Sequence, residues 1–168
     1  MNKNNLDYIA MLRSGSDKQV WSAFLALAHE KENLPEYFTE VHSCLERLLS
    51  NLDSNSNNGY FAALGIRALA CLLREYSLKY SDRRFLIQFE NLLERALLCG
   101  DDNAVKGVLA AISLDAPMHG APLLPTIEKI GSKYKSRAVP PIWCWQFDDC
   151  VEVVKDPSRW CKVQNKNP

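Results

Sequence analysis

The stretch YFAALGIRALACLLREYSLKY, from Tyr60 to Tyr80, decides the fold. Apolar residues occupy almost every side of a helix drawn through it, and only a helix covered by neighbours on both sides tolerates that distribution. Gly65 and the four alanines would let those neighbours approach closely. We therefore predict that this segment is the central helix of an all-α domain.

The segment before this stretch has the clearest one-sided pattern in the chain. Asn33, Pro35 and Glu36 form a helix-start signature in which Asn33 and Glu36 resemble a capping box. A single apolar stripe follows at helical spacing. It consists of Phe38, Val41, Leu45, Leu48 and Leu52. These features predict an amphipathic helix that ends before the polar, turn-rich loop at residues 53–59.

The segment after it repeats the pattern. Ser81-Asp82 suits a helix start, an apolar stripe runs from Phe85 to Leu97, and Gly100 is placed to end the helix in the left-handed conformation. Asp101-Asp102 then opens a shorter helix. Pro122 and Pro125 fit the first turn of another helix, which we expect to stop at Gly131.

Six helical segments thus group two by two, with Asp17 as the expected cap of the first, at a period of about forty residues. The predicted pairs of antiparallel helices cover about 17–52, 59–99 and 101–131 within a single domain, 1–168. Such a period is typical of stacked α-helical repeats, which present surfaces to macromolecules.

The tail, 139–163, differs in composition and is expected to form an aromatic cap. Trp143, Trp145 and Trp160 all follow Pro140-Pro141. Residues 142–147 alternate like a strand, whereas Phe147 begins a helical pattern that continues to residue 154. We predict an extended approach and one short helix ending before Pro157. A β-hairpin turning at Asp148-Asp149 is the alternative.

The paired helices of residues 17–131 resemble the HEAT and armadillo repeats. HEAT repeats carry a proline within the first helix of a pair, whereas Pro35 and Pro122 stand at the start of second helices here. A generic α/α superhelix fits equally well. In size, fold class and Asn/Lys-rich start, the chain is also similar to bacterial immunity proteins of contact-dependent growth inhibition and other polymorphic toxin systems. That resemblance implies a protein that binds a cognate toxin, such as a nuclease, and occludes its active site.

The charge pattern suggests where such a partner would bind. Lys+Arg and Asp+Glu number 20 each, which argues against a dedicated nucleic-acid binder. Residues 1–60 nevertheless hold eight acids and five bases. The acids on and before the second helix would complement a basic toxin surface, unless they form only a solvated helix face. They are Glu30, Glu32, Glu36, Glu40 and Glu46.

Trp143 and Trp145 are further candidate partner-binding residues, because tryptophan is a frequent interface anchor. The alternative is that the tail tryptophans plug the end of the helical stack. The basic residues between 129 and 162 offer a second candidate function, nucleic-acid binding by a helical repeat. They are Lys129, Lys133, Lys135, Arg137, Lys155, Arg159 and Lys162.

A metal- or thiol-dependent enzyme is the third candidate, based on Cys144, Cys150, Cys161 and His119. Their spacings match no tight zinc knuckle, and three thiols packed among tryptophans is the simpler reading. No catalytic motif appears, so we predict neither an enzyme nor a cofactor. No signal peptide or bilayer-length apolar run is visible. We therefore expect a cytoplasmic protein with reduced cysteines and no membrane partner.

Overall fold

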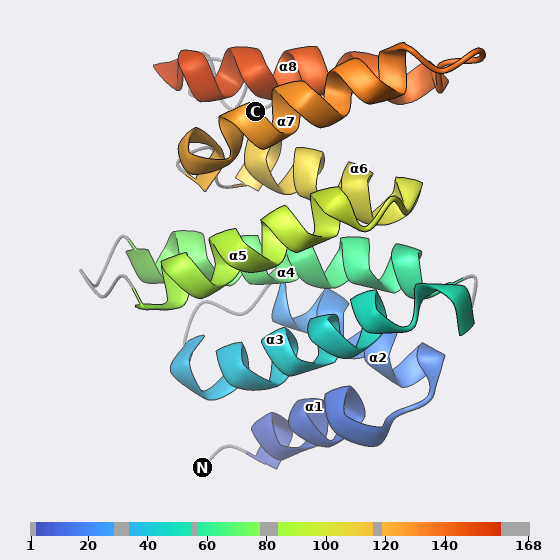
Figure 1. Ribbon diagram of the computed structural model, residues 1–168. Helices are drawn as coiled ribbons and strands as arrows, with labels where there is room; N and C mark the ends of the chain where they lie inside the picture. The colour runs from blue at the N-terminus through green and yellow to red at the C-terminus, as the bar shows by residue number, and fades with distance from the viewer. Residues whose placement is uncertain (1–2, 29–33, 55–56, 78–83, 116–118, 159–168) are drawn as a thin grey trace, which may run out of the picture.

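The computed structural model describes residues 3–28, 34–54, 57–77, 84–115 and 119–158. These residues form an all-α fold, and no strand occurs among them. The helices are α1 (Lys3–Ser14), α2 (Asp17–Leu27), α3 (Leu34–Ser50), α4 (Asn58–Ser77), α5 (Arg84–Leu98), α6 (Asp102–Ala110), α7 (Gly120–Lys135) and α8 (Trp145–Lys155). Figure 1 shows them stacked in chain order, from α1 at one end to α8 at the other.

The stack has two rows of helices. In one row α1, α3, α5 and α7 follow one another in contact, and in the other row α2, α4, α6 and α8 do the same (Figure 1). In a helical repeat each helix pair contacts only its neighbours. The pairs must stack, because no single pair can bury its apolar face alone. The arrangement is therefore compatible with a helical-repeat fold.

Helix α4 occupies the middle of this stack, as the Tyr60–Tyr80 stretch predicts. It contacts α2, α3, α5 and α6, and it buries residues on nearly all sides. The added Cβ of a residue at position 65 would lie 2.7 Å from both Leu45 Cδ2 and Phe24 Cζ, so Gly65 admits neighbours from α3 and α2. The end of the predicted segment, from Leu78, lies outside the described residues.

The helices that pack most closely are not those that the sequence groups together. Helix α3 packs mainly on α4, and α7 packs on α8, whereas α2 and α3 share little contact. Helix α1 (Lys3–Ser14) stands outside the three predicted pairs, yet it packs on α2. The predicted pairs begin at α2, so they are displaced by one helix from the pairs that pack together. The reason is that periodicity identifies an apolar face but not which neighbour covers it.

Two of the predicted helix caps are correct and one is displaced. Gly100 has φ 82°, the left-handed conformation predicted for it. Asp101 then caps α6, and its Oδ1 accepts hydrogen bonds at 2.9 Å from two backbone N–H groups of the first turn. The expected cap at Asp17 is wrong by one residue. Ser16 is the cap, and the Gln19 side chain accepts from the Ser16 backbone N–H at 2.8 Å.

Helix α7 differs from its prediction at both ends. It begins at Gly120, which places Pro125 inside the helix, beyond the first turn. It also continues through Gly131 to Lys135. Gly131 acts here by its size: an added Cβ would lie 3.0 Å from Phe147 Cγ of α8, so the glycine permits close packing rather than ending the helix.

The tail is helical, and its predicted extended approach is wrong. Residues Ile142–Cys144 form a single 3-10 turn that leads directly into α8. The helix ends before Pro157, as expected. Phe147, Cys150 and Val154 are its buried residues, and that helical spacing against α6 and α7 overrides the strand-like alternation. Trp160 and Cys161 lie outside the described residues.

Candidate functional site

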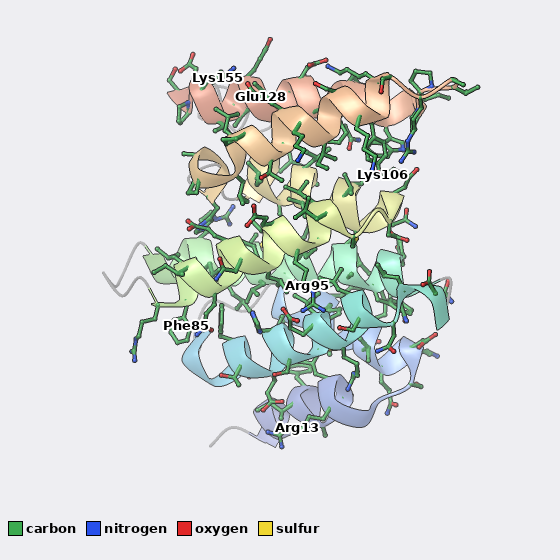
Figure 2. The ribbon with its side chains drawn as sticks, viewed as in Figure 1. Arg13, Phe85, Arg95, Lys106, Glu128 and Lys155 are labelled. Carbon is green, nitrogen blue, oxygen red and sulfur yellow. The ribbon has the colours of Figure 1, made fainter. Side chains whose placement is uncertain are left out.

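The acidic residues predicted to meet a partner are bound within the stack where the structure describes them. Glu40 of α3 forms a two-point ion pair with Arg13 of α1, with Arg13 Nε donating to Oε2 at 2.9 Å. Glu46, also on α3, pairs with Arg95 of α5, which additionally donates to Ser50 Oγ at 2.7 Å. Figure 2 labels both arginines, which reach α3 from opposite sides.

These ion pairs neutralise the negative charge that an acidic binding surface on α3 would require. The hydrogen bond from the Arg13 guanidinium lowers the pKa of the Glu40 carboxyl below its usual range. Arg47 strengthens the same junction by donating to the carbonyl oxygens of Leu12 and Arg13, each at 2.8 Å. Glu30 and Glu32 lie outside the described residues, as does the side chain of Glu36. The two acids of α3 whose side chains are described, Glu40 and Glu46, are therefore both paired with arginines of neighbouring helices.

The two tryptophans predicted as anchors have different environments. Trp143 is half-buried and packs against Tyr134 at 5.1 Å and Phe147 at 5.9 Å between ring centroids. Lys106 Nζ lies 5.1 Å from its ring centroid, a cation–π contact from α6 (Lys106 is labelled in Figure 2). Trp143 therefore joins α6, α7 and α8, as the plug interpretation requires.

Tyr134 is the centre of this aromatic cluster. Its hydroxyl donates to Asp102 Oδ1 at 2.9 Å, and the Arg137 guanidinium lies over its ring at 3.7 Å from the centroid. Burial, followed by the hydrogen bond to Asp102, raises the pKa of Tyr134 to about 12. The residue is thus a neutral structural contact, and the sequence pattern did not identify it because it follows the expected helix end at Gly131.

Trp145, in contrast, is 57% exposed at the first position of α8. It is accompanied by Ile142, which is 96% exposed, and Val139, which is 84% exposed. We call these three residues the C-terminal surface. Large apolar side chains held this far into solvent mark interaction sites when they occur together. Pro140 and Pro141 lie between Val139 and Ile142 and restrict the backbone there, because the proline ring fixes φ.

Residue type in the sequence points to Trp145 as an anchor but not to Val139 or Ile142. The sequence does contain one sign of their exposure, because the two residues flank a Pro-Pro pair. The strand-like alternation places Ile142 in an extended segment, in which alternate side chains face opposite ways, and Val139 lies before that segment. The 3-10 turn at Ile142–Cys144 instead buries Cys144 and leaves Ile142 in solvent.

Three bases of the region predicted for nucleic acid, Lys135, Arg137 and Lys155, pair with acids, and Arg159 and Lys162 lie outside the described residues. Lys155 of α8 donates to Glu128 of α7 at 2.8 Å, and the two lie side by side in Figure 2. Lys135 pairs with Asp148 in the same way. A groove of about 390 Å³ lies between α7 and α8. Its lining residues are Ile127, Glu128, Gly131, Ser132, Lys135, Phe147, Asp148 and Val151.

The cysteines and histidine proposed as a metal or thiol site do not converge where they are described. Cys144 and Cys150 are buried free thiols, and burial raises the pKa of Cys150 to about 11. His119 is 2% exposed, with Nδ1 3.5 Å from Glu90 Oε1 and its ring edge-on to Phe89. Among the described residues, no group of three His, Cys, Asp or Glu side chains is arranged to hold a metal ion.

Among the described helices, none combines the length and the apolar character that crossing a bilayer requires. No protein-family model matches this chain, and neither the curated proteins nor the solved structures contain a match.

Proposed function

We propose that this chain is a protein-binding module that engages its partner through the C-terminal surface. The observation that carries the proposal is the joint exposure of Val139, Ile142 and Trp145 at 84%, 96% and 57%. Exposed aromatic and aliphatic side chains of this kind can supply a binding hot spot, because their burial removes apolar area from water.

In its narrower form the proposal makes the partner a cognate toxin domain, so that the chain acts as a HEAT-like immunity protein. The support is the resemblance in size and all-α class, together with a two-row helical stack that places the surface on its last pair. Binding would neutralise the toxin by covering its active site. Nothing in the chemistry of the described residues favours the nucleic-acid or enzyme alternatives over this one.

The test begins with the reading frame next to the gene. Its product is expressed as a candidate toxin, and growth is measured with and without this chain. The proposal expects the chain to restore growth and to bind the product in calorimetry. An Ile142→Ser, Trp145→Ala variant is expected to lose at least tenfold in affinity, because two exposed anchors are removed.

Ile87→Ser is the matched control, since Ile87 is 57% exposed on α5, far from the C-terminal surface. It should bind as the unaltered chain does. Equal affinity for the two variants would reject the C-terminal surface as the binding site, and growth inhibition that this chain does not relieve would reject the immunity role for that pair.

A further inference from the structure

His119 is a polar side chain that the fold buries without satisfying it. It lies at the start of α7 and is 2% exposed. Its Nδ1 lies 3.5 Å from Glu90 Oε1 of α5, the length of a weak hydrogen bond, whereas its buried Nε2 has no hydrogen-bond partner among the described residues. An ionised Glu90 can only accept, so it places the ring proton on Nδ1 and leaves Nε2 as an acceptor without a donor. A buried polar atom of this kind costs free energy and calls for an explanation.

The surroundings of this side chain are closely packed and mostly apolar. The ring of Phe89, on α5, meets it edge-on at 5.3 Å between ring centroids. At the next residue, Gly120, an added Cβ would lie 2.1 Å from Val154 Cγ2 of α8 and 2.7 Å from Ile112 Cγ2. Ile112 belongs to the π-helical turn Ala111–Asp115, which follows α6. The start of α7 is therefore packed against α5, α8 and this turn, and we call this meeting point the α7 junction.

Glu90 is the charged group that acts on His119 from the elements packed against it. Among the described residues no other charge contributes to the shift of the His119 pKa. The side chains that α8 and the π-helical turn bring to the α7 junction, Val154 and Ile112, are apolar. Glu90 favours the protonated ring, but its side chain is 25% exposed, and burial of His119 outweighs it and lowers the pKa below 6.5. The closed junction thus holds His119 neutral near pH 7.

We propose that protonation of His119 opens the α7 junction, so that the last pair of helices loosens in acid while α4 stays closed. A proton on Nε2 creates a buried, charged donor that has no acceptor, and this cost is relieved when the ring reaches water. In the open state His119 regains its ordinary affinity for protons, so lowering the pH favours opening. The device needs no partner, and its test is therefore independent of the proposed function.

The size of the effect follows from proton linkage. Opening exposes a histidine with the ordinary pKa of 6.5, so between about pH 7.5 and about pH 5 the equilibrium constant for opening rises by up to about 30-fold. The upper limit applies when the closed junction takes up no proton at the lower pH. Isolated helices as short as α7 and α8 are marginal in water, so opening removes the protection of their amides.

Native-state hydrogen exchange, read by mass spectrometry at about pH 7.5 and about pH 5, measures the opening once each rate is divided by the intrinsic exchange rate at that pH. The opening constant of the amides at 124–128 and 150–155 should rise at least about fivefold in acid and should exceed that of α4 at both pH values. No rise would overturn the proposal. Exchange of these amides only together with α4 would also overturn it, because it would show global unfolding instead of opening at the α7 junction.

The variant His119→Gln tests the cause, because glutamine keeps a polar side chain but takes up no proton in this range. The rise at amides 124–128 should fall below about twofold. His42→Gln is the matched control, since burial also lowers the pKa of His42, but this residue lies on α3, where it stacks on Phe38. That variant should keep the full rise. A rise that survives in His119→Gln, or that His42→Gln removes, contradicts the proposal.

A titration of the unaltered chain needs no substitution and covers the case in which His119→Gln does not fold. The ring signals of His119 in ¹H–¹³C NMR should titrate with a midpoint below 6.5, and the amides at the start of α7 should shift with the same midpoint. A midpoint at or above 6.5 would mean that the closed junction accommodates the protonated ring, and it would reject the proposal.

Discussion

At the scale of single residues, the informative contrast is between Trp143 and Trp145. They are two positions apart, yet one packs on Tyr134 and Phe147 while the other is 57% exposed. Both were predicted as anchors from residue type alone. In the turn that leads into α8, successive side chains point in different directions around the helix axis, and only the backbone path shows which one reaches the core.

This contrast predicts that substitutions of buried and exposed aromatic residues in α8 lower the free energy of unfolding by different amounts. Phe147→Ala removes a side chain that is 2% exposed and should lower the free energy of unfolding by about 3–5 kcal/mol. Trp145→Ala removes a side chain that lies in solvent, and it should change the free energy of unfolding by no more than about 0.5 kcal/mol. Urea titrations followed by far-UV circular dichroism measure both. Equal losses would mean that Trp145 packs in the fold.

His119 predicts a dependence of stability on pH. Burial lowers its pKa from the ordinary value of 6.5, so the folded state takes up a proton less readily than the unfolded chain. The free energy of unfolding must therefore fall as the pH is lowered below 6.5, until the pKa of the folded state is passed. The decrease should be measurable in denaturant titrations between about pH 7.5 and about pH 5.

The variant His119→Gln removes this titration and should flatten the decrease. His42, whose pKa burial also lowers, remains in both proteins and leaves a residual slope. Parallel pH curves for the two proteins would show that His119 does not cause the decrease.

At the scale of elements, helix ends depend on contacts between helices as well as on local sequence. Asp101 caps α6 as its residue type predicts. It also presses against α4, where an added Cβ at Gly59 would lie 2.1 Å from Asp101 Oδ1. The sequence therefore indicates the cap correctly, but not the reason why position 59 is a glycine.

This contact predicts coupling between the two positions. Gly59→Ala should destabilise the protein by about 1–3 kcal/mol, because it displaces the Asp101 carboxylate. Asp101→Ala alone should cost about 1 kcal/mol through the lost cap. In the double variant the clash disappears, so the combined loss should be smaller than the sum. A double-mutant cycle by urea denaturation measures this, and strict additivity would refute the contact.

At the scale of the whole molecule, stability should follow position in the stack. Helix α4 is covered by α2, α3, α5 and α6, whereas α1 and α8 have neighbours mainly on one side. Regions with few buried contacts open most readily. Native-state hydrogen exchange by mass spectrometry should therefore find the slowest amides in α4 and faster exchange in α1 and α8. The reverse order would contradict this stack.

The surface charge is also decided at this scale. Glu40 and Glu46 look like part of an exposed acidic face along α3 because both lie off the apolar stripe of this amphipathic helix. Their partners, Arg13 and Arg95, are 27 and 49 residues away in the chain. No local pattern connects residues so far apart, so the sequence could predict the acids but not their neutralisation.

The sequence by itself determined the helices and their buried faces, since helical periodicity and the Asp101 and Gly100 signals act within a few residues. It placed the Tyr60–Tyr80 helix in the core for the same reason. Only the tertiary structure decided which helices pack together, which tryptophan enters the core, and which bases pair with Glu40 and Glu46. Those outcomes depend on contacts between distant segments, whose free energies are set by packing and charge pairing in three dimensions.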